Sequence, residues 1–160
     1  MQFFSEKIRR RRVRKENFFN FFSVMNRKNK IPYKLFQVTL KALISRGGKL
    51  LILKDRGQAK KWDLPGGRIE EKDLPLPMHE ALRRELREEL GRRAKISIGK
   101  MFYCSKLKTN LGKYSHGLVV MIFLAKYSGG AIRLSREHDA YLWADKESHQ
   151  KYKFHAHLQE

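Results

Sequence analysis

The sequence predicts an α/β fold for a single main domain. Several runs of residues have the alternation and composition of β-strands, and one central segment has the period of an amphipathic helix. At 160 residues the chain is long enough for one domain with a substantial core and too short for two. We therefore expect the domain to span residues 35–160, preceded by a basic extension over residues 1–34.

Two strands are predicted before the helix. The run LFQVTLKALI, which begins at Leu35, alternates apolar and polar residues, and Arg46-Gly47-Gly48 then turns the chain into KLLILKD. A basic loop, Lys54 to Lys61, leads from there to Trp62. We expect Trp62 to cap the core beside the Gly-Gly turn that follows it, with stacking on a base as the alternative.

The helix is predicted from Met78 to Leu90. Pro77 stands just before it, where a missing N–H costs nothing, and Gly91 ends it. Residues three and four apart form an apolar stripe along one side. The stripe consists of Met78, Ala81 or Leu82, Leu86 and Leu90.

The chain after the helix returns to strand patterns. AKISIGKMFYCSKL, which begins at Ala94, predicts one strand, and a polar, basic connection follows from Lys106 to Ser115. The apolar run from His116 to Tyr127 predicts a long buried strand. Ser128-Gly129-Gly130 makes a turn, and a last strand is expected over residues 140–145.

Three glutamates share another face of the predicted helix. Glu85, Glu88 and Glu89 stand at i, i+3 and i+4. Such a cluster repels itself unless a cation neutralises it, and hard carboxylate oxygens suit Mg²⁺ or Mn²⁺. Upstream, Pro65-Gly66-Gly67 predicts a turn in which the backbone can approach a ligand or metal closely.

The alternative for this helix is an ordinary solvated surface. Arg84 could form i,i+4 ion pairs with Glu80 and with Glu88, each worth a few tenths of a kcal/mol. The Gly-Gly turn and the flanking strands favour the metal site over this alternative.

The stretch from Gly67 to the end of the helix resembles the Nudix box, G-x5-E-x7-R-E-U-x-E-E-x-G-U, in which U is a bulky aliphatic residue. Gly67 matches the opening Gly, and the core REUxEExG that begins at Arg84 matches in full. The sequence departs from the pattern in three ways: Asp73 replaces the first Glu, three extra residues precede Arg84, and Arg92 replaces the last aliphatic residue. The extra residues are expected in the loop before the helix, which leaves the glutamate face intact. With its flanking strands the resemblance covers residues 35–146.

The resemblance implies an α/β/α sandwich around a mixed β-sheet and a role for each residue of the box. Glu85 and Glu89 are implied to bind Mg²⁺ (or Mn²⁺) together with the carbonyl of Gly67. Glu88 is implied to be a metal ligand or the general base, and Arg84 to orient a glutamate by ion pairing.

The activity that the resemblance implies is Mg-dependent hydrolysis of a phosphoanhydride bond in a nucleoside diphosphate linked to another moiety. The added signatures of the family's ADP-ribose, diadenosine polyphosphate and NADH hydrolases do not match this sequence. A nucleoside triphosphate or a nucleotide sugar is therefore the expected substrate. The alternative function is a non-catalytic Nudix-fold module that binds RNA or another polyanion.

Glu137 is a candidate catalytic residue outside the box. It precedes the segment that contains Trp143, which resembles the late Nudix strand that follows one or two acidic residues. Glu137 is either a further metal ligand or base, or a solvated loop charge, and both interpretations stay open. His155 and His157 are expected in a solvated tail, because no carboxylate or Cys stands at ligand spacing.

The composition is strongly basic. A formal net charge of +20 predicts attraction to polyanions such as nucleotides, RNA or anionic membrane surfaces. The single Cys104 excludes an intrachain disulfide and fits a reducing cytosol, so a cytoplasmic location is expected. No apolar run approaches the roughly 20 residues that span a bilayer.

The extension over residues 1–34 contains eleven Lys and Arg and two Glu. Asn20 breaks its apolar part and no small-residue cleavage site follows, which argues against a signal peptide. Residues 7–34 could contact RNA or an anionic surface without sequence specificity. The alternatives are a disordered tail, or a true start of the protein at Met25.

Overall fold

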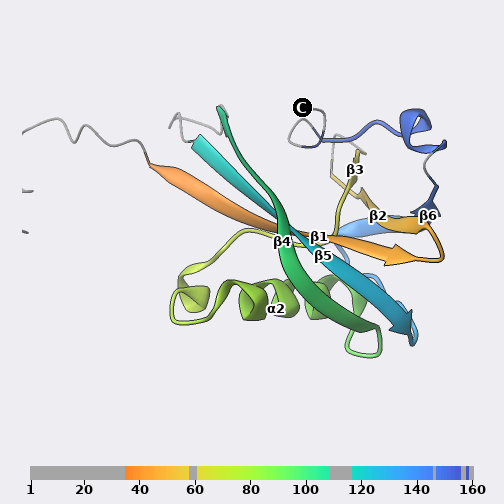
Figure 1. The fold of residues 1–160 in the computed structure, drawn as a ribbon, viewed down its shortest axis with the longest axis horizontal. Helices are drawn as coiled ribbons and strands as arrows, with labels where there is room; N and C mark the ends of the chain where they lie inside the picture. Colours follow the sequence, from red (N-terminus) through yellow and green to blue (C-terminus); the bar gives the residue numbers. More distant parts are fainter. Residues whose placement is uncertain (1–34, 58–60, 109–116, 146, 156–157, 159–160) are drawn as a thin grey trace, which may run out of the picture. The chain divides into compact units, whose positions relative to one another are not determined.

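The computed structural model describes residues 35–57, 61–108, 117–145, 147–155 and 158 (Figure 1). Its elements, in chain order, are β1 (Phe36–Arg46), β2 (Lys49–Asp55), β3 (Trp62–Asp63), η1 (Glu71–Asp73), α2 (Met78–Leu90), β4 (Lys95–Lys108), β5 (Gly117–Gly129), β6 (His138–Ala144) and η2 (His149–Lys151). The expectations for residues 1–34, on RNA, membranes and the start of the chain, lie outside the described residues. Among the described helices, none is long and apolar enough to cross a membrane.

The strands form one mixed sheet of six strands. Their order is β3-β2-β1-β5-β4, and β6 also pairs with β2, from Leu50↔Ala144 to Asp55↔His138. β1 and β5 are parallel from Phe36↔Gly117 to Ser45↔Lys126, and the other pairs are antiparallel. The α/β class that the sequence predicted and the mixed sheet that the resemblance implied are confirmed.

A loop occupies the edge of β1 that β2 leaves open. β2 pairs with β1 only at Ser45↔Leu50 and Arg46↔Lys49, near the hairpin turn. Further along β1, backbone bonds of 2.8 to 2.9 Å join Ala42 N to Pro65 O, Leu40 N to Gly67 O and Ile69 N to Val38 O. The segment 65–69 therefore runs along β1 like a short strand, which fixes the glycine loop against the middle of the sheet.

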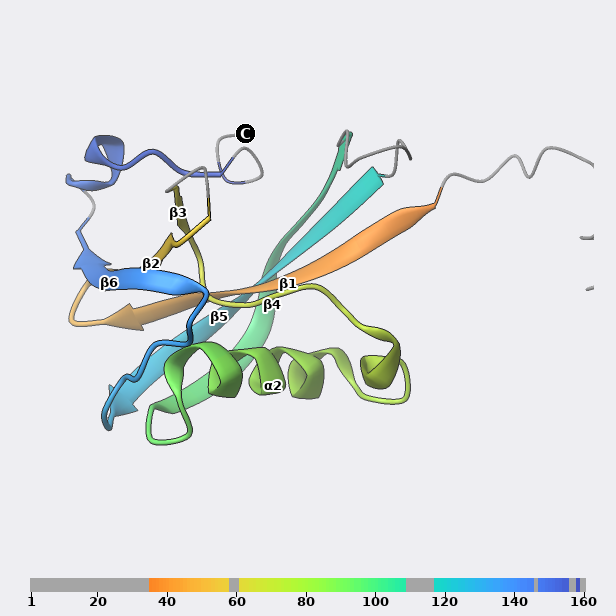
Figure 2. The same ribbon diagram turned by 180° about the vertical axis from the view of Figure 1, so that it is seen from behind.

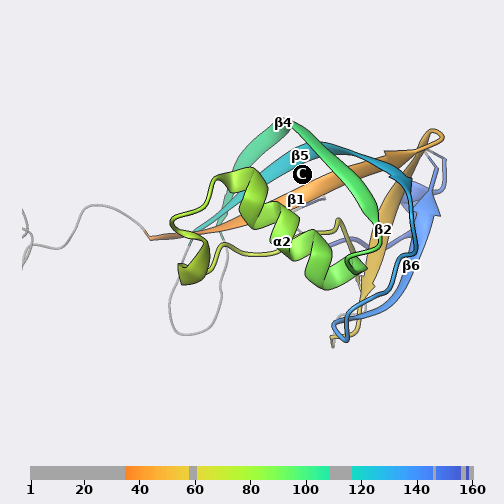
Figure 3. The same cartoon turned by 90° about the horizontal axis from the view of Figure 1, so that it is seen from below.

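Helix α2 covers one face of the sheet (Figures 2 and 3). Its bounds are the predicted ones: Pro77 stands at the N-cap and Gly91, with φ 82°, at the C-cap. Four apolar side chains of the helix are buried in a cluster with strands β1, β2 and β5: Ala81, Leu82, Leu86 and Leu90. Met78, predicted in the same stripe, is 43% exposed. That prediction is wrong because the cluster under the helix begins only at Ala81 and Leu82.

The other face of the sheet is covered by the C-terminal segment. A second buried cluster, formed by side chains of β2, β5 and β6, is joined by Trp62, Tyr152 and Phe154. The rings of Trp62 and Tyr152 meet edge to face with centroids 5.2 Å apart, so Trp62 packs in this core. In the described residues, the layer on this face consists of that segment and the short η2 instead of an α-helix.

Candidate active site

A cleft of about 1160 Å³ opens between the glycine loop, the C-terminal half of α2 and the segment before β6. Glutamates and cationic side chains both line it. The glutamates are Glu70, Glu85, Glu88, Glu89 and Glu137; the lysines and arginines are Lys41, Arg56, Lys61, Arg68 and Arg136. All four glutamates proposed for the site from the sequence, including Glu137, which lies far from the others in the chain, thus come to one cleft.

Gly66 forms the narrowest point of the loop. Its φ is +121°, and a Cβ there would lie 2.2 Å from the carbonyl oxygen of Leu40. Its N–H donates to Glu89 Oε2 at 2.7 Å, and its carbonyl accepts a hydrogen bond from Lys41 Nζ at 2.6 Å. Only glycine allows this close approach, because a side chain would push the loop away from β1 and from Glu89.

Gly67 lies against the carboxylate of Glu85. A Cβ at Gly67 would be 2.4 Å from Glu85 Oε2, so the missing side chain leaves the space that the carboxylate occupies. The Gly67 carbonyl, implied above as a metal ligand, accepts hydrogen bonds from Leu40 N at 2.9 Å and from Thr39 Oγ1 at 3.0 Å. It could therefore contact a metal only if the Thr39 hydroxyl turned away.

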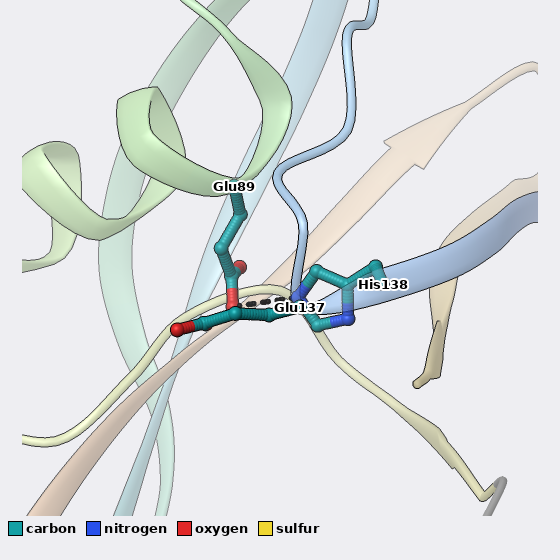
Figure 4. Close-up of side chains that lie close together, drawn as sticks. All are labelled: Glu89, Glu137 and His138. Atoms are coloured by element: carbon teal, nitrogen blue, oxygen red, sulfur yellow. Dashed lines mark hydrogen bonds and ion pairs between the residues drawn. The ribbon is translucent and has the colours of Figure 1, made fainter. Parts of the chain in front are cut away.

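Glu89 is buried and held at both oxygens. Besides the bond from Gly66 to Oε2, Oε1 lies 3.1 Å from Nε2 of His138 (Figure 4). Glu89, Glu137 and His138 each place one potential ligand atom within 4.8 Å of the others. Glu137 reaches this point from an exposed turn in which its N–H donates to Ser135 Oγ and its carbonyl accepts from Arg56 N.

His138 is a site residue that the sequence analysis missed. Burial acts to lower the pKa of its imidazole, but the hydrogen bond to Glu89 and the charge of that carboxylate outweigh burial, so the pKa is raised. Its Nδ1 is buried and lacks a hydrogen-bond partner among the described residues. A neutral ring with its proton on Nε2 leaves only an acceptor unpaired, so His138 acts as a donor to Glu89. The one sequence feature that could have pointed to His138 is its position directly after Glu137.

Arg84 forms the centre of an ion-pair network at the side of the cleft. It donates twice to Asp73, from Nε at 2.8 Å and from Nη2 at 2.6 Å, and once each to Glu85 at 2.6 Å and Glu88 at 2.8 Å. The hydrogen bonds from Arg84 lower the pKa of the buried Asp73, and those to Asp73 first of all raise the pKa of Arg84. Of the two ion pairs that the surface-helix alternative offered, the one with Glu88 is present, whereas Glu80 pairs with Arg83.

Glu85 and Glu88 differ in burial. The side chain of Glu85 is 13% exposed and that of Glu88 is 54% exposed. Burial, together with the nearby charges of Glu89 and Glu88, raises the pKa of Glu85, although Arg84 opposes this. The negative charge at Glu85 is therefore only partly compensated by the protein itself.

A buried ion pair lies under the glycine loop. Lys41 Nζ is 2.8 Å from Asp63 Oδ2, and the two side chains are 9% and 16% exposed. Because Lys41 also donates to the carbonyl of Gly66, this pair fixes the loop from below. In the sequence, Lys41 stands out only as a polar position in an alternating strand.

His155 lies in the cleft lining and not in a solvated tail as expected. Backbone bonds from Trp62 N to Lys153 O and from His155 N to Trp62 O draw the C-terminal segment alongside β3. This places His155 Nε2 3.6 Å from Asp55 Oδ2. His157 lies outside the described residues.

Comparison with known proteins gives a consistent result. A family model described as the NUDIX domain matches residues 36–159. The MutT protein from Methanosarcina mazei Go1 has a similar structure, with 25% identity, a TM-score of 0.64, and 79% of this chain and 89% of that chain covered. For the MutT NUDIX hydrolase from Burkholderia pseudomallei the identity is 27% and the TM-score 0.52, with 69% and 83% covered.

The ORF135 protein of E. coli shows the same fold, with 23% identity and a TM-score of 0.57. The match covers 77% of this chain and 83% of that chain. A search of the curated proteins found no match.

Proposed function

The chain belongs to the Nudix family, and from this premise we propose that it hydrolyses a phosphoanhydride bond in a nucleoside diphosphate linked to another moiety. One observation carries the proposal. Glu85 and Glu89 are held against the glycine loop in a cleft that also contains several lysines and arginines. Carboxylates suit a divalent cation, and the cationic side chains suit the phosphates of a nucleotide.

The residues present fit a hard divalent cation, Mg²⁺ or Mn²⁺. Gly67 leaves room for the Glu85 carboxylate that a Cβ would fill, and burial beside Glu89 and Glu88 raises the pKa of Glu85. Glu85, Glu88 and Glu89 would hold the ion, joined by the carbonyl of Gly67 if Thr39 releases it. When bound, such an ion neutralises phosphate charge and lowers the pKa of a coordinated water.

The protein's own groups divide the remaining tasks. Arg84 holds Glu85 and Glu88 in position through its network with Asp73, so it acts as a positioning residue. His138 and the N–H of Gly66 do the same for Glu89. Glu88 and Glu137 are the candidates to accept the proton of the attacking water, because both are exposed to the cleft.

The cationic side chains support a substrate with more than one phosphate. Lys61, Arg68 and Arg136 line the cleft and can bind phosphate oxygens without disturbing the glutamates. This suits the expected classes, nucleoside triphosphates and nucleotide sugars.

A substrate panel tests the proposal. Nucleoside triphosphates, nucleotide sugars and dinucleotides are incubated with the full chain and Mg²⁺, and the phosphorylated products are separated and identified. Hydrolysis of at least one class, abolished by a chelator and restored by excess Mg²⁺, is expected. Glu71→Gln, a change at an exposed glutamate outside the cleft lining, is the matched control and should keep the parent rate. Binding of nucleotides or RNA without turnover, and without sensitivity to chelator, would favour the binding module instead.

A further inference from the structure

The outer edge of the sheet carries an unusual strand. β4 is 14 residues long and pairs only with β5 among the described strands, at the end of the strand order (Figure 3). Its register shifts three times, between Lys95 and Ile96, between Ile98 and Met101, and between Met101 and Tyr103. These irregularities turn successive side chains outward, and every residue from Gly99 to Cys104 is exposed.

Large apolar side chains stand in this exposed stretch. Met101 is 49% exposed, Phe102 63% and Tyr103 43%. Met101 lies opposite Phe123 and Tyr103 opposite Ile122, and Phe102 falls at the register shift between Met101 and Tyr103. We call residues 99–104 the β4 patch. Neighbouring exposed aromatic and sulfur side chains on a sheet edge suggest a surface that a partner covers.

The chain segment that contains β4, β5 and the turns beside them carries only positive charges. The sequence from Leu90 to Arg136 contains ten Lys and Arg and no Asp or Glu. Several of the cations are exposed on β4, on β5 and on the turn before β4: Arg92, Arg93, Lys95, Lys100, Lys106 and Lys126. In the part of the chain that the structure describes, none of these six forms a salt bridge. The surface therefore lacks the mixed charges of an ordinary solvated face.

We propose that the β4 patch binds single-stranded nucleic acid. The surrounding lysines and arginines match a phosphate backbone, and Phe102 and Tyr103 offer ring faces on which unpaired bases can stack. A second copy of the chain fits less well, because pairing two such edges would bring the cations of both copies together. A duplex fits less well too, because its bases are already stacked and do not reach exposed rings.

This surface is separate from the catalytic cleft. None of residues 95–106 lines the cleft, whose nearest contributors from these strands are Leu107 and Leu118. The inference therefore goes beyond the proposed hydrolysis and does not depend on it. Nucleic acid bound at β4 would not compete with a nucleotide substrate.

Fluorescence anisotropy with a labelled oligouridine of about 12 nucleotides tests the proposal on the full chain. Phe102→Ala and Tyr103→Ala should each weaken binding about tenfold. When 2-aminopurine is placed in the oligonucleotide, stacking on these rings should quench its fluorescence with the parent, and the quenching should be lost with the two variants. Tyr141→Ala is the matched control, because Tyr141 is 42% exposed but lies on β6. Charge-neutral changes are used because residues 1–34 also carry eleven Lys and Arg, which attract any polyanion.

Other outcomes would overturn the proposal. Unchanged affinity in both aromatic variants would assign the binding to charge elsewhere in the chain. Tighter binding of a duplex than of the single strand would show that the patch does not bind unpaired bases by stacking. The patch would instead be an interface between copies if the parent sediments as a dimer and Phe102→Ala sediments as a monomer with unaltered affinity for the oligonucleotide. Nucleotide hydrolysis is measured in the same samples and should stay at the parent rate, so failure here is distinguishable from failure of the proposed function.

Discussion

The two halves of helix α2 contact the rest of the site in opposite ways. At the first half, the Asp73 carboxylate is fully buried and receives two hydrogen bonds from Arg84, so charge and donors match. At the second half, the donors to Glu89 among the described residues are neutral or weakly basic, namely the N–H of Gly66 and the imidazole of His138. We call these the Arg84 corner and the Glu89 corner.

The difference indicates which corner holds the fold and which one binds. A carboxylate paired with a guanidinium is already satisfied and positions its neighbours. A cluster of carboxylates with few cations of its own keeps the capacity to attract a metal ion. Glu85 stands between the corners, since it contacts Arg84 on one side and Gly67 on the other. The predictions below test this division, from the largest expected effect to the smallest.

Asp73→Asn should have the largest effect, and on stability. The change removes the charge of a fully buried partner from the half-buried guanidinium of Arg84, which costs about 3 kcal/mol in the free energy of unfolding. Glu88→Gln removes an exposed partner of the same arginine and should cost less than about 1 kcal/mol. Urea denaturation of both variants measures the difference. Equal losses would show that burial does not distinguish the partners of Arg84.

The same pair predicts a pH dependence. The pKa of Asp73 is lowered in the folded state, so the unfolded chain binds its proton more readily. The stabilisation by this pair is present above the unfolded pKa of about 4 and is lost as pH falls through the folded pKa. On acidification the parent should therefore lose more stability than Asp73→Asn, as followed by denaturation at a series of pH values.

Glu89→Gln should affect turnover most. The amide keeps the shape but removes one negative charge, and the rate should fall by about two orders of magnitude, about 3 kcal/mol in the barrier. Two effects on the metal-free fold oppose each other. Removing the charge relieves repulsion among the glutamates, which stabilises the fold. An amide NH₂ facing His138 needs an acceptor, so the imidazole proton must move to Nδ1, which has no partner among the described residues. The melting temperature without metal should therefore change little. A parent-like rate in steady-state assays would return the helix to the surface interpretation.

Glu137→Gln should reduce turnover by about tenfold, because its carboxylate reaches the Glu89 corner from an exposed turn. The melting temperature should stay within error, since the hydrogen bonds of that turn in this structure use the backbone of Glu137. Asp139, two residues on, pairs with Arg56 and provides an Asp139→Asn control. A rate within about twofold of the parent would make Glu137 a solvated loop charge.

The smallest effect is expected from shortening the chain to begin at Met25. The elements of the sheet and the whole cleft lie after residue 34, so folding and turnover should not change. Differential scanning calorimetry measures the melting temperature of the shortened chain, and a steady-state assay measures its rate of hydrolysis. Loss of either property would show that the extension contributes to the domain.

Local patterns in the sequence predicted the elements well. The alternation in β1, the helix bounds at Pro77 and Gly91, and the face shared by the glutamates all follow from spacing and backbone preferences. Contacts between segments that are distant in the chain could not be predicted from these local patterns. His138, Lys41 and the pairing of His155 with Asp55 depend on which strand ends meet, and no short-range pattern records that. Met78 failed for the same reason, because exposure depends on what lies opposite a residue.

The most direct test of the division between the two corners is the calorimetric titration of Mg²⁺ or Mn²⁺ into the metal-free full chain and its variants. Glu89→Gln should lower the affinity for the ion about tenfold or more, because it removes a ligand charge. Asp73→Asn, at a temperature where it is folded, should bind the ion within about twofold of the parent, since Asp73 is occupied by Arg84. Equal affinities of the parent and Glu89→Gln, or a greater loss in Asp73→Asn than in Glu89→Gln, would contradict the account.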